Sequence, residues 1–420
     1  MIAVSLFSGC GGLDFGIQAA GFTIPFCNDI DRFSCHTLRL NGATCVAECS
    51  VADVSASRIA VLAGSAVAHE IDLLFGGPPC QPFSKSGYWL RGDSLRLDDP
   101  RSDTLAHFFR LVEELRPRAF LLENVHGISY SGKEEGFAYI LDRIEAINRK
   151  IGTKYLPSWR VLNTADYGVP QARTRFFMVG LRDGTPFVFP VATHGQKDNG
   201  PPALFDRHLQ PCLTAWDAIG HLEPDADENL VVGGRWAALL PSIPEGENYS
   251  WHTDRKQGLP LFGWRTRYWC FLLKLAKNRP SWTLQAQPGP AIGPFHWKNR
   301  RLSWREMAAL QTFPTSFRIK APRIEVQRQL GNAVPSLMAE ILGREIAAHL
   351  GQKQATQPRR LAVPRAKEVP PPEKCSEVPP EYHQLIGVHA AHPGTGKGPS
   401  YQRMEEEQCD EPEQIGRAHV

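Results

Sequence analysis

The first part of the chain, roughly 190 residues, alternates short apolar runs with stretches of helical periodicity, and this alternation limits the fold more than any other feature. Strands that follow one another through helices form a parallel sheet covered on both faces. We therefore predict an α/β fold with a mostly parallel sheet, whose ligands bind beyond the carboxyl ends of the strands. The pattern predicts strands at 2–7, 22–27, 71–75, 119–122 and 176–181 and helices at 12–20, 31–41, 104–115 and 136–149.

The later part of the chain has a different sequence pattern. From Thr193 to Arg300 the sequence is irregular, with scattered Pro and Gly, seven Trp and a helical pattern only at 268–277. Helical periodicity returns at 303–310 and 336–350, and a Pro-rich segment with little periodicity follows. We predict a first domain over 1–192, an irregular domain over 193–300, helices returning to the first domain over 301–351, and a disordered tail over 352–420.

Charge is balanced over the whole chain but not locally. The 47 Lys and Arg residues exceed the 44 Asp and Glu residues by only three. Attraction to a nucleic acid must therefore come from a local cluster. Between Asp254 and Arg328 there are fifteen basic residues and three acidic ones, so this stretch is the expected contact surface for a phosphate backbone.

Several classes of protein are disfavoured by composition. The ten cysteines form no C-x-x-C pair and no Cys/His spacing suited to zinc, so we expect neither a disulfide scaffold nor a metal site. The N-terminus lacks a basic region, and no apolar run approaches the ~18 residues of a membrane span. We expect a cytoplasmic protein that uses no membrane. The stretch 414–420 matches the translation of a common sequencing adapter, so we expect the natural C-terminus to be absent.

A glycine-rich loop follows the first predicted strand. It reads Phe7-Ser-Gly9-Cys-Gly11-Gly12-Leu13 and precedes a predicted helix, a context in which glycines let a ligand approach the backbone. The second strand leads to Asp29, about 20 residues on, where an acid can accept hydrogen bonds from both ribose hydroxyls. Together these features indicate a nucleoside-type cofactor, either a dinucleotide or S-adenosylmethionine.

Reactive side chains follow the later strands. Cys80 comes after a buried strand among rigid prolines, which makes a poor core position and a good exposed turn. Glu123 closes the next apolar strand and is expected at the same sheet edge. Arg173 and Arg175 lie on one face of a strand at period two, where they form either a surface stripe or a pair that presents a guanidinium to a carbonyl oxygen in a pocket.

These segments, in this order, resemble the motif set of the cytosine-5 DNA methyltransferases. The resemblance covers about residues 2–350 and implies the S-adenosylmethionine-dependent, Rossmann-like fold, with the irregular region as the target-recognition domain. The segments are Phe7-Ser-Gly-Cys-Gly-Gly, Pro78-Pro-Cys-Gln-Pro-Phe-Ser84, Glu123-Asn-Val, Gln171-Ala-Arg-Thr-Arg175, Arg301-Leu-Ser-Trp-Arg-Glu-Met-Ala-Ala-Leu-Gln-Thr-Phe-Pro314 and Gln329-Leu-Gly-Asn-Ala-Val-Pro335.

The resemblance implies a chemistry that also follows from the reactivity of cytosine. C5 is too weak a nucleophile to take a methyl group unaided, so the Cys80 thiolate would add to C6. Glu123 would hydrogen-bond N3 and the exocyclic amine, while Arg175 holds O2 with support from Arg173. C6 is unreachable in a stacked duplex, so the base must be flipped out of double-stranded DNA.

Cofactor and DNA contacts are implied residue by residue. Where the family usually has Gly-Asp-Ile before the catalytic strand, this chain has Cys49-Ser50-Val51, so the contact with the adenine amine is in doubt. The implied cofactor residues are Phe7, Gly9, Gly11, Gly12, Leu13, Asp29, Ile30, Ser50, Pro78, Asn332, Ala333 and Val334. The implied DNA contacts are Gln81, Ser84, Arg265, Arg267, Lys298, Arg300 and Arg301.

Three other classes of protein share parts of this motif set. A transfer-RNA cytosine-5 methyltransferase would share the catalytic motifs but carry a Cys-Phe-Thr signature, which this sequence lacks. An inactive DNA-binding regulator would be expected to lack Cys80, and a dinucleotide oxidoreductase would leave the Cys/Glu/Arg set without a role. No regulatory domain precedes Phe7, so we expect a monomeric bacterial modification enzyme with a cognate restriction endonuclease encoded nearby.

Overall fold

The computed structural model describes residues 1–64, 70–79, 103–125, 134–195, 209–265, 268–352 and 358–388. Cys80, Gln81, Ser84 and Arg267 lie outside these residues. By its internal contacts the chain divides into two units. The larger unit comprises Met1–Leu230, Ala276–Pro288 and Leu302–Pro371, and the smaller unit comprises Val231–Leu275, Gly289–Arg301 and the chain from Pro372 on.

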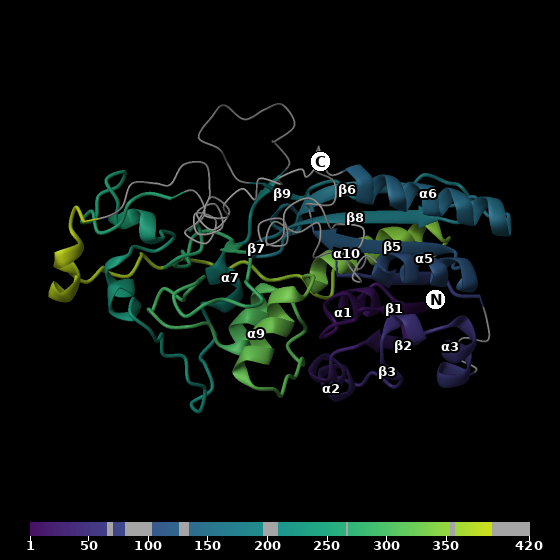
Figure 1. Ribbon diagram of the computed structural model, residues 1–420, viewed down its shortest axis with the longest axis horizontal. Coiled ribbons are helices and arrows are strands. Elements are labelled where there is room, and N and C mark those ends of the chain that lie inside the picture. Colours follow the sequence, from purple (N-terminus) through teal and green to yellow (C-terminus); the bar gives the residue numbers. More distant parts are fainter. Residues whose placement is uncertain are drawn as a thin grey trace, which may run out of the picture. The chain divides into compact units, whose positions relative to one another are not determined.

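A seven-stranded sheet forms the centre of the larger unit (Figure 1). The five strands from β3 to β5 are parallel, and β8 runs antiparallel to both of its neighbours. This is the mostly parallel sheet that the strand–helix alternation predicts. In spatial order the strands are β3 (Val46–Glu48), β2 (Thr23–Asp29), β1 (Ile2–Leu6), β4 (Leu73–Gly76), β5 (Ala119–Val125), β8 (Thr174–Leu181) and β6 (Leu156–Asn163).

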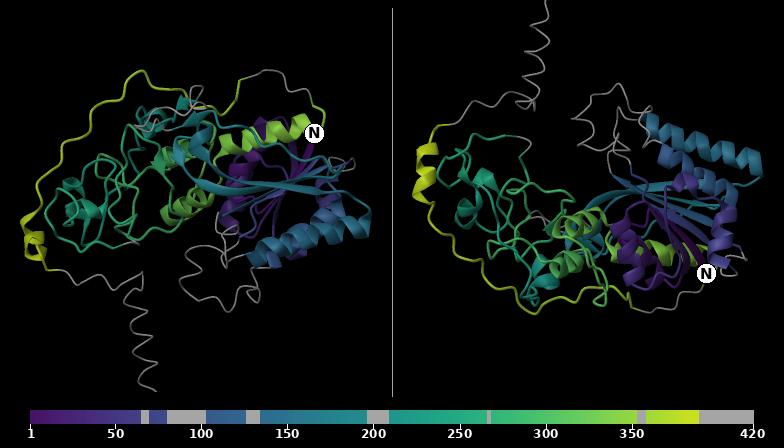
Figure 2. Two further views of the ribbon diagram at one scale, coloured as in Figure 1. Left: turned by 90° about the horizontal axis from the view of Figure 1, so that it is seen from above. Right: turned by 60° about the horizontal axis from the view of Figure 1, so that its bottom comes forward.

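Helices cover both faces of this sheet because its central strands are apolar on both sides. In β5, Leu121 packs with α1 and α10, whereas its neighbours Phe120 and Leu122 pack with α5 and α6. Figure 2 shows α10 and α6 on opposite faces of the sheet. The helices named here are α1 (Gly12–Ala19), α5 (Asp103–Leu115), α6 (Glu134–Ile151) and α10 (Ser336–His349).

Local signals account for several helix starts. The Asp31 carboxylate accepts the Ser34 backbone N–H at 2.8 Å and caps α2 (Arg32–Leu40). Ser303 and Glu306 form a capping box at the start of α8 (Trp304–Leu310). The remaining helical segments of the larger unit are α3 (Ala56–Ala63), α7 (Ala215–Ile219), α9 (Arg323–Asn332), η1 (Val51–Asp53) and η5 (Thr164–Tyr167); its short strands are β7 (Gln171–Ala172), β9 (His194–Gly195), β10 (Gln210–Pro211) and β11 (Ser281–Trp282).

One predicted helix is wrong. The segment 268–277 contains no helix, although its apolar residues have helical spacing. Phe271 instead forms a β-bridge with Ile292 and Lys274 forms one with Phe295, while Leu272 has a φ of 52°. Pairing with a distant segment therefore decides the backbone conformation here and overrides local periodicity.

The smaller unit has its own aromatic core. Trp236, Tyr249, Phe262 and Phe271 pack against one another with ring centroids 5.1–5.9 Å apart. Its helical segments are the short turns η7 (Ala237–Ser242), η8 (Tyr249–His252) and η9 (Pro380–Leu385). Aromatic packing thus compensates for the scarcity of regular structure in this part of the chain.

Part of the C-terminal segment follows a defined path, which differs from the disorder expected over 352–420. Residues 358–371, called the strap below, are bound to the larger unit. The buried Glu340 carboxylate accepts the backbone N–H groups of Arg360 and Leu361 at 2.7 and 2.9 Å. Farther along, Asp217 accepts the backbone N–H of Ala366 at 2.7 Å. These carboxylates bind the main chain of the strap, so the lack of side-chain periodicity does not report its order.

Candidate active site

A pocket of about 460 Å³ opens at the edge of the sheet where the parallel strands end. Loops after β1, β2, β4 and β5 contribute to it, together with the first residues of the antiparallel strand β8. The lining residues are Phe7–Cys10, Gly12, Leu13, Asn28–Asp31, Ser34, Ser50, Val51, Gly77–Pro79, Thr104, Glu123–Val125, Arg173, Arg175, Arg328, Gln329 and Asn332–Val334.

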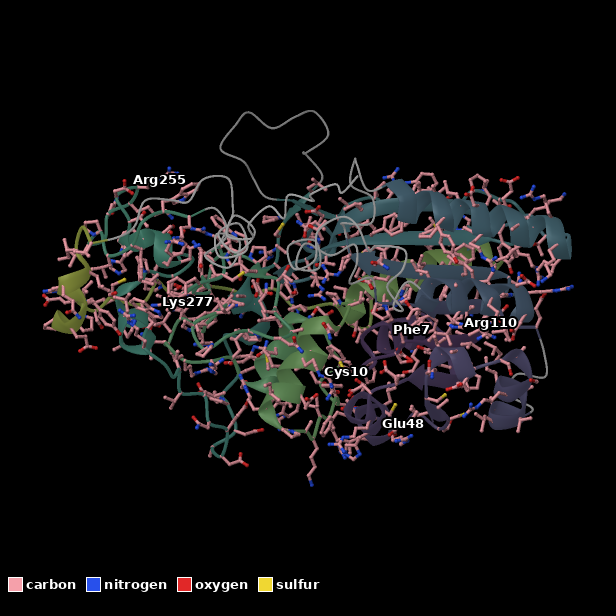
Figure 3. All side chains as sticks on the ribbon, viewed as in Figure 1. Phe7, Cys10, Glu48, Arg110, Arg255 and Lys277 are labelled. Carbon is pink, nitrogen blue, oxygen red and sulfur yellow. The ribbon has the colours of Figure 1, made fainter. Side chains whose placement is uncertain are left out.

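The glycine-rich loop forms one wall of this pocket. Its bend requires left-handed backbone at Gly9, with φ of 55°, and at Phe7, with φ of 54°. A Cβ placed on Gly9 would meet no atom within 4 Å, so the space above it is open to a ligand. Gly12 is needed for another reason, because a Cβ there would lie 2.4 Å from the carbonyl oxygen of Val334. Figure 3 labels Phe7 and Cys10 on this loop.

The last residue of β2 and the residue after it place one polar and one apolar side chain in the pocket lining. The Asp29 carboxylate accepts the Gly9 N–H at 2.7 Å and the Asp31 N–H at 2.8 Å, which fixes its orientation. Burial raises the pKa of Asp29, against the lowering effect of these two hydrogen bonds. Beside it, Ile30 leaves 74% of its surface exposed in the pocket wall. A fixed carboxylate next to an exposed apolar side chain suits a ribose and its base.

Ser50 lies at the same end of the pocket. Its hydroxyl oxygen accepts the Ala52 N–H at 3.2 Å and caps η1, so the hydroxyl proton remains available to donate. Gly11, predicted as a cofactor residue, does not line the pocket. A Cβ on Gly11 would meet Phe15 and Leu38 at 3.1 and 3.2 Å, so this glycine faces the interior and serves the turn.

Glu123 and Arg175 form the acidic and basic pair of the site. Arg175 lies opposite Val125 in the antiparallel β5–β8 pairing, which brings its side chain to the end of β5. Its Nε lies 3.1 Å from Oε1 of Glu123. Burial raises the pKa of Glu123, although Arg175 and Arg173 act in the opposite direction. The pair can therefore offer a substrate both a proton-holding carboxyl group and a planar cation.

Arg173, which lies just before β8, connects this strand with the segment Gly331–Val334. Its side chain is 1% exposed, and Nη2 donates to the carbonyl oxygens of Gly331 and Asn332 at 3.0 and 3.2 Å. These contacts hold the Asn332–Val334 segment at the pocket wall. The sequence separates the two segments by more than 150 residues, and the geometry explains why a second arginine lies two positions before Arg175.

Further polar contacts fix the segment that leads to Cys80. The Asn124 amide donates to the Pro78 carbonyl oxygen at 3.3 Å, and the Thr104 hydroxyl donates to the Pro79 carbonyl oxygen at 3.2 Å. A Cβ on Gly77 would lie 2.7 Å from Oε2 of Glu123, so a larger residue at this position would have to displace the carboxylate. Cys80, the predicted nucleophile, follows Pro79 directly and lies outside the described residues.

Some pocket residues were not predicted from the sequence. Arg328 donates to Asp31 at 2.7 Å, and both residues line the pocket with Cys10 and Ser34. Arg328 and Gln329 lie just before the Gly331–Val334 segment, and Asp31 follows the predicted Asp29 by two residues. Their nearness in sequence to predicted cofactor residues is the signal that could have identified them as pocket residues.

A mostly parallel sheet with an antiparallel β8, and a pocket at the ends of its parallel strands that is lined by an acid–arginine pair, define an α/β fold of the methyltransferase class. Solved structures agree on the fold. The chain superposes on a prophage-encoded DNA modification methyltransferase (E. coli) with a TM-score of 0.57 at 24% identity, over 84% of this chain and 100% of that one. It superposes on the Entamoeba histolytica methyltransferase EhMeth with a TM-score of 0.56 at 17% identity, over 84% and 99%.

Sequence comparison gives the family. Residues 1–348 match the C-5 cytosine-specific DNA methylase family, and the chain belongs to it. The type II methyltransferase M.SacI of Streptomyces achromogenes is 38% identical over 371 residues, which cover 83% of this chain and 93% of that protein. M.NgoFVII of Neisseria gonorrhoeae, also a type II methyltransferase, is 32% identical over 79% of this chain and 82% of its own length. The protein is a DNA (cytosine-5)-methyltransferase of the type found in restriction–modification systems.

No helix in the described part of the chain combines the length and the apolar character that crossing a membrane requires. The His, Cys, Asp and Glu side chains of this part likewise form no group of three or more suited to holding a metal ion.

Proposed function

We propose that this methyltransferase transfers the methyl group of S-adenosylmethionine to C5 of a cytosine flipped out of a specific double-stranded DNA site, through a covalent bond between Cys80 and C6. The observation that carries the proposal is the Glu123–Arg175 pair, 3.1 Å apart, beside the fixed Gly77-Pro78-Pro79 segment that delivers Cys80. Family membership supports the same reaction.

The pocket fits S-adenosylmethionine in its donor groups. Asp29 would accept hydrogen bonds from the ribose hydroxyls, and Ile30 and Phe7 would contact the adenine ring. The open space above Gly9 suits the methionine part of the cofactor, with Ala333 and Val334 packed beside Gly12 of the same loop and Asn332 next to them in the pocket lining. Ser50 can hydrogen-bond the adenine edge but carries no charge. When bound, the cofactor supplies an electrophilic methyl group on a sulfonium.

The protein's own groups would perform the remaining chemistry. The Cys80 thiolate adds to C6, and Glu123 places a proton at N3 while accepting from the exocyclic amine. Arg175 donates to O2, and C5 thereby becomes nucleophilic enough to take the methyl group. Loss of the C5 proton to solvent, return of the N3 proton to Glu123 and elimination of the thiolate from C6 then restore Cys80 and aromatic methylcytosine. A carboxyl group with a raised pKa suits the role of Glu123, because it must hold a proton near neutral pH.

Base flipping costs about a few kcal/mol of stacking and pairing. We propose that Gln81 and Ser84 contact the DNA beside the flipped base, and that the smaller unit reads the target sequence. It contains Arg265, Lys298, Arg300 and Arg301, four of the predicted DNA contacts; Arg267 lies outside the described residues. The enzyme would act as a monomer in the bacterial cytoplasm and protect host DNA from a cognate nuclease.

The test is bisulfite sequencing of plasmid DNA from a methylation-free bacterial host that expresses the chain. Protected cytosines within one short motif would establish both the reaction and the recognition site. C80A should abolish protection, whereas C375A, which alters an exposed cysteine of the smaller unit, should leave it intact. Unprotected DNA from folded wild-type protein, or undiminished protection by C80A, would refute the proposal.

A further inference from the structure

We propose that Arg255 is a specificity-determining residue that reads a guanine in the target site through a bidentate hydrogen bond. This inference rests on the proposed role of the smaller unit in DNA recognition and names a residue outside the predicted DNA contacts. Arg255 is exposed in the smaller unit, and Figure 3 labels it at the outline of this unit.

A rigid turn presents Arg255. The fully buried Thr253 donates its hydroxyl proton to the Ser250 carbonyl oxygen at 2.8 Å and accepts the Arg255 N–H at 3.3 Å. The turn closes where the Gly258 N–H donates to the Trp251 carbonyl oxygen at 3.0 Å. The backbone of the exposed segment is therefore anchored at both ends, and Arg255 projects from a fixed base.

The side chain of Arg255 is also pre-oriented. Its Cζ lies 3.7 Å above the ring centroid of Trp264. Two other arginine–aromatic contacts among the described residues of the smaller unit are longer, at 4.7 Å for Arg235 on Trp236 and 5.7 Å for Arg265 on Tyr268. A guanidinium held at this distance from an indole gains a cation–π interaction while its N–H groups stay free to donate. The stack thus removes part of the entropy cost of binding.

The donors of Arg255 are uncommitted. Among the described residues, its guanidinium has no hydrogen bond or ion pair and contacts only the Trp264 ring. Nearby cations differ in this respect. Lys256 is paired with Glu247, Arg300 donates to the Arg301 carbonyl oxygen at 3.0 Å, and Arg301 donates to the Pro290 carbonyl oxygen at 3.3 Å. An exposed, oriented arginine whose guanidinium pairs with none of the described polar side chains can donate to an external acceptor.

The geometry favours a guanine over a phosphate. A planar guanidinium matches two acceptors side by side, and in the major groove O6 and N7 of guanine provide that arrangement. A phosphate can also accept two hydrogen bonds from arginine, but lysine can take its place there as a point charge, whereas the paired acceptors of a guanine require the planar fork. The turn and the stack fix the orientation that such a base-edge contact needs, and the response to lysine at this position separates the two cases.

The experiment measures kcat/KM on the cognate duplex and on duplexes in which each G·C pair of the site is replaced in turn. R255A and R255K should both lower kcat/KM on the cognate site by about 10- to 100-fold, because lysine keeps the charge and loses the planar fork. Both variants should also stop discriminating at one G·C position. W264L should cause a smaller loss of the same kind. K256A removes the adjacent charge and should remain within about threefold of the wild type.

Several outcomes would overturn the inference. Full activity and unchanged discrimination in R255A would do so, and so would rescue by R255K. An equal loss of affinity for every duplex, with a salt dependence reduced by about one phosphate, would identify a backbone contact instead. Thermal unfolding and S-adenosylmethionine binding of each variant should match the wild type. Failure of the wild type to methylate any duplex would refute the proposed function and this inference together.

Discussion

Glu123 and Arg175 face each other across the antiparallel pairing of β5 and β8, with Oε1 of the acid 3.1 Å from Nε of the base. Both side chains are largely buried, at 12% and 17% exposure. The ion pair holds the carboxyl group in one orientation, while burial raises its pKa. The arrangement fixes the carboxyl group in place and raises its pKa above the usual value, toward the range in which it can exchange a proton with a substrate.

We expect E123Q to lower the rate of methyl transfer by about 10²- to 10⁴-fold, the usual loss when a general acid or base is removed. Glutamine preserves the shape of the side chain but cannot exchange a proton with N3. Single-turnover methylation with labelled cofactor measures the effect, and cofactor affinity by calorimetry should change little. The control is E113Q, which removes a carboxylate that pairs with Lys150 on the surface. A single-turnover rate within threefold of the wild type would remove Glu123 from the chemistry.

Gly77 should be irreplaceable for activity rather than for folding. A Cβ at this position would lie 2.7 Å from Oε2 of Glu123, closer than non-bonded atoms approach. G77A should displace the carboxylate and lower kcat/KM by roughly 10-fold or more, because sub-ångström placement governs such steps. G233A is the matched control, since no atom lies within 4 Å of a Cβ there. Equal activity of the two variants would contradict this account.

Much of the site could be predicted because strand order and strand direction determine which residues meet. Asp29 is the last residue of β2, Glu123 lies near the end of β5 and Cys80 follows β4 in the sequence, and parallel strands end at one edge of the sheet. The structure places Asp29 and Glu123 in one pocket, as predicted. The role of Cys80 stays a prediction. The sequence pattern places Arg173 and Arg175 on one strand face, but Arg173 lies just before β8 and only Arg175 is within it; both nevertheless line the pocket, because β8 begins at this edge of the sheet.

Other features depend on non-local contacts that local patterns cannot report. Arg328 reaches the pocket only because α9 packs near Asp31, nearly 300 residues away in the sequence. The segment 268–277 has helical periodicity, yet its pairing with residues near 292–295 gives it bridged, irregular backbone. Leu361 and its neighbours look like a disordered linker, but a buried carboxylate on α10 binds their main chain. In each case the decisive partner is remote.

Asp14 predicts a pH dependence of stability. This carboxyl group is 4% exposed near the start of α1 and accepts the Cys27 thiol at 3.4 Å. Burial raises its pKa from 3.8 to about 6. Because the folded state binds this proton more tightly than the unfolded state, the stabilising contribution is full below pH 4 and is lost as the pH rises through about 6.

The variant D14N should therefore lack this pH-dependent contribution to the free energy of unfolding. The shift of about two pKa units corresponds to roughly 3 kcal/mol, so D14N should gain stability relative to the wild type as the pH rises from 4 to 7. Urea unfolding at pH 4, 5, 6 and 7 measures the difference between the two proteins. The exposed carboxyl group of Asp53 provides the control D53N, for which the difference should stay constant. A parallel pH profile for D14N and wild type would show that the Asp14 proton is not linked to folding.

We expect the strap to stabilise the larger unit through its contacts with Glu340. Its fully buried carboxylate binds the backbone N–H groups of Arg360 and Leu361 and pairs with Arg344. E340A would leave two donors and a cation without their acceptor, and each unsatisfied buried donor costs about 1–3 kcal/mol. We expect the midpoint of thermal unfolding to fall by at least ~5 °C, at about 2–4 °C per kcal/mol for a unit of this size.

A matched control separates the strap from a general effect of charge on α10. Glu345 lies on the same helix and is only partly buried, so E345A should shift the midpoint by less than half as much. A chain that ends at Gln352 should lose as much stability as E340A, and adding E340A to that shortened chain should cost less than it does in the full chain, because the N–H groups it serves are already gone. Additive losses would mean that Glu340 stabilises the helix through Arg344 alone and that the strap contributes separately.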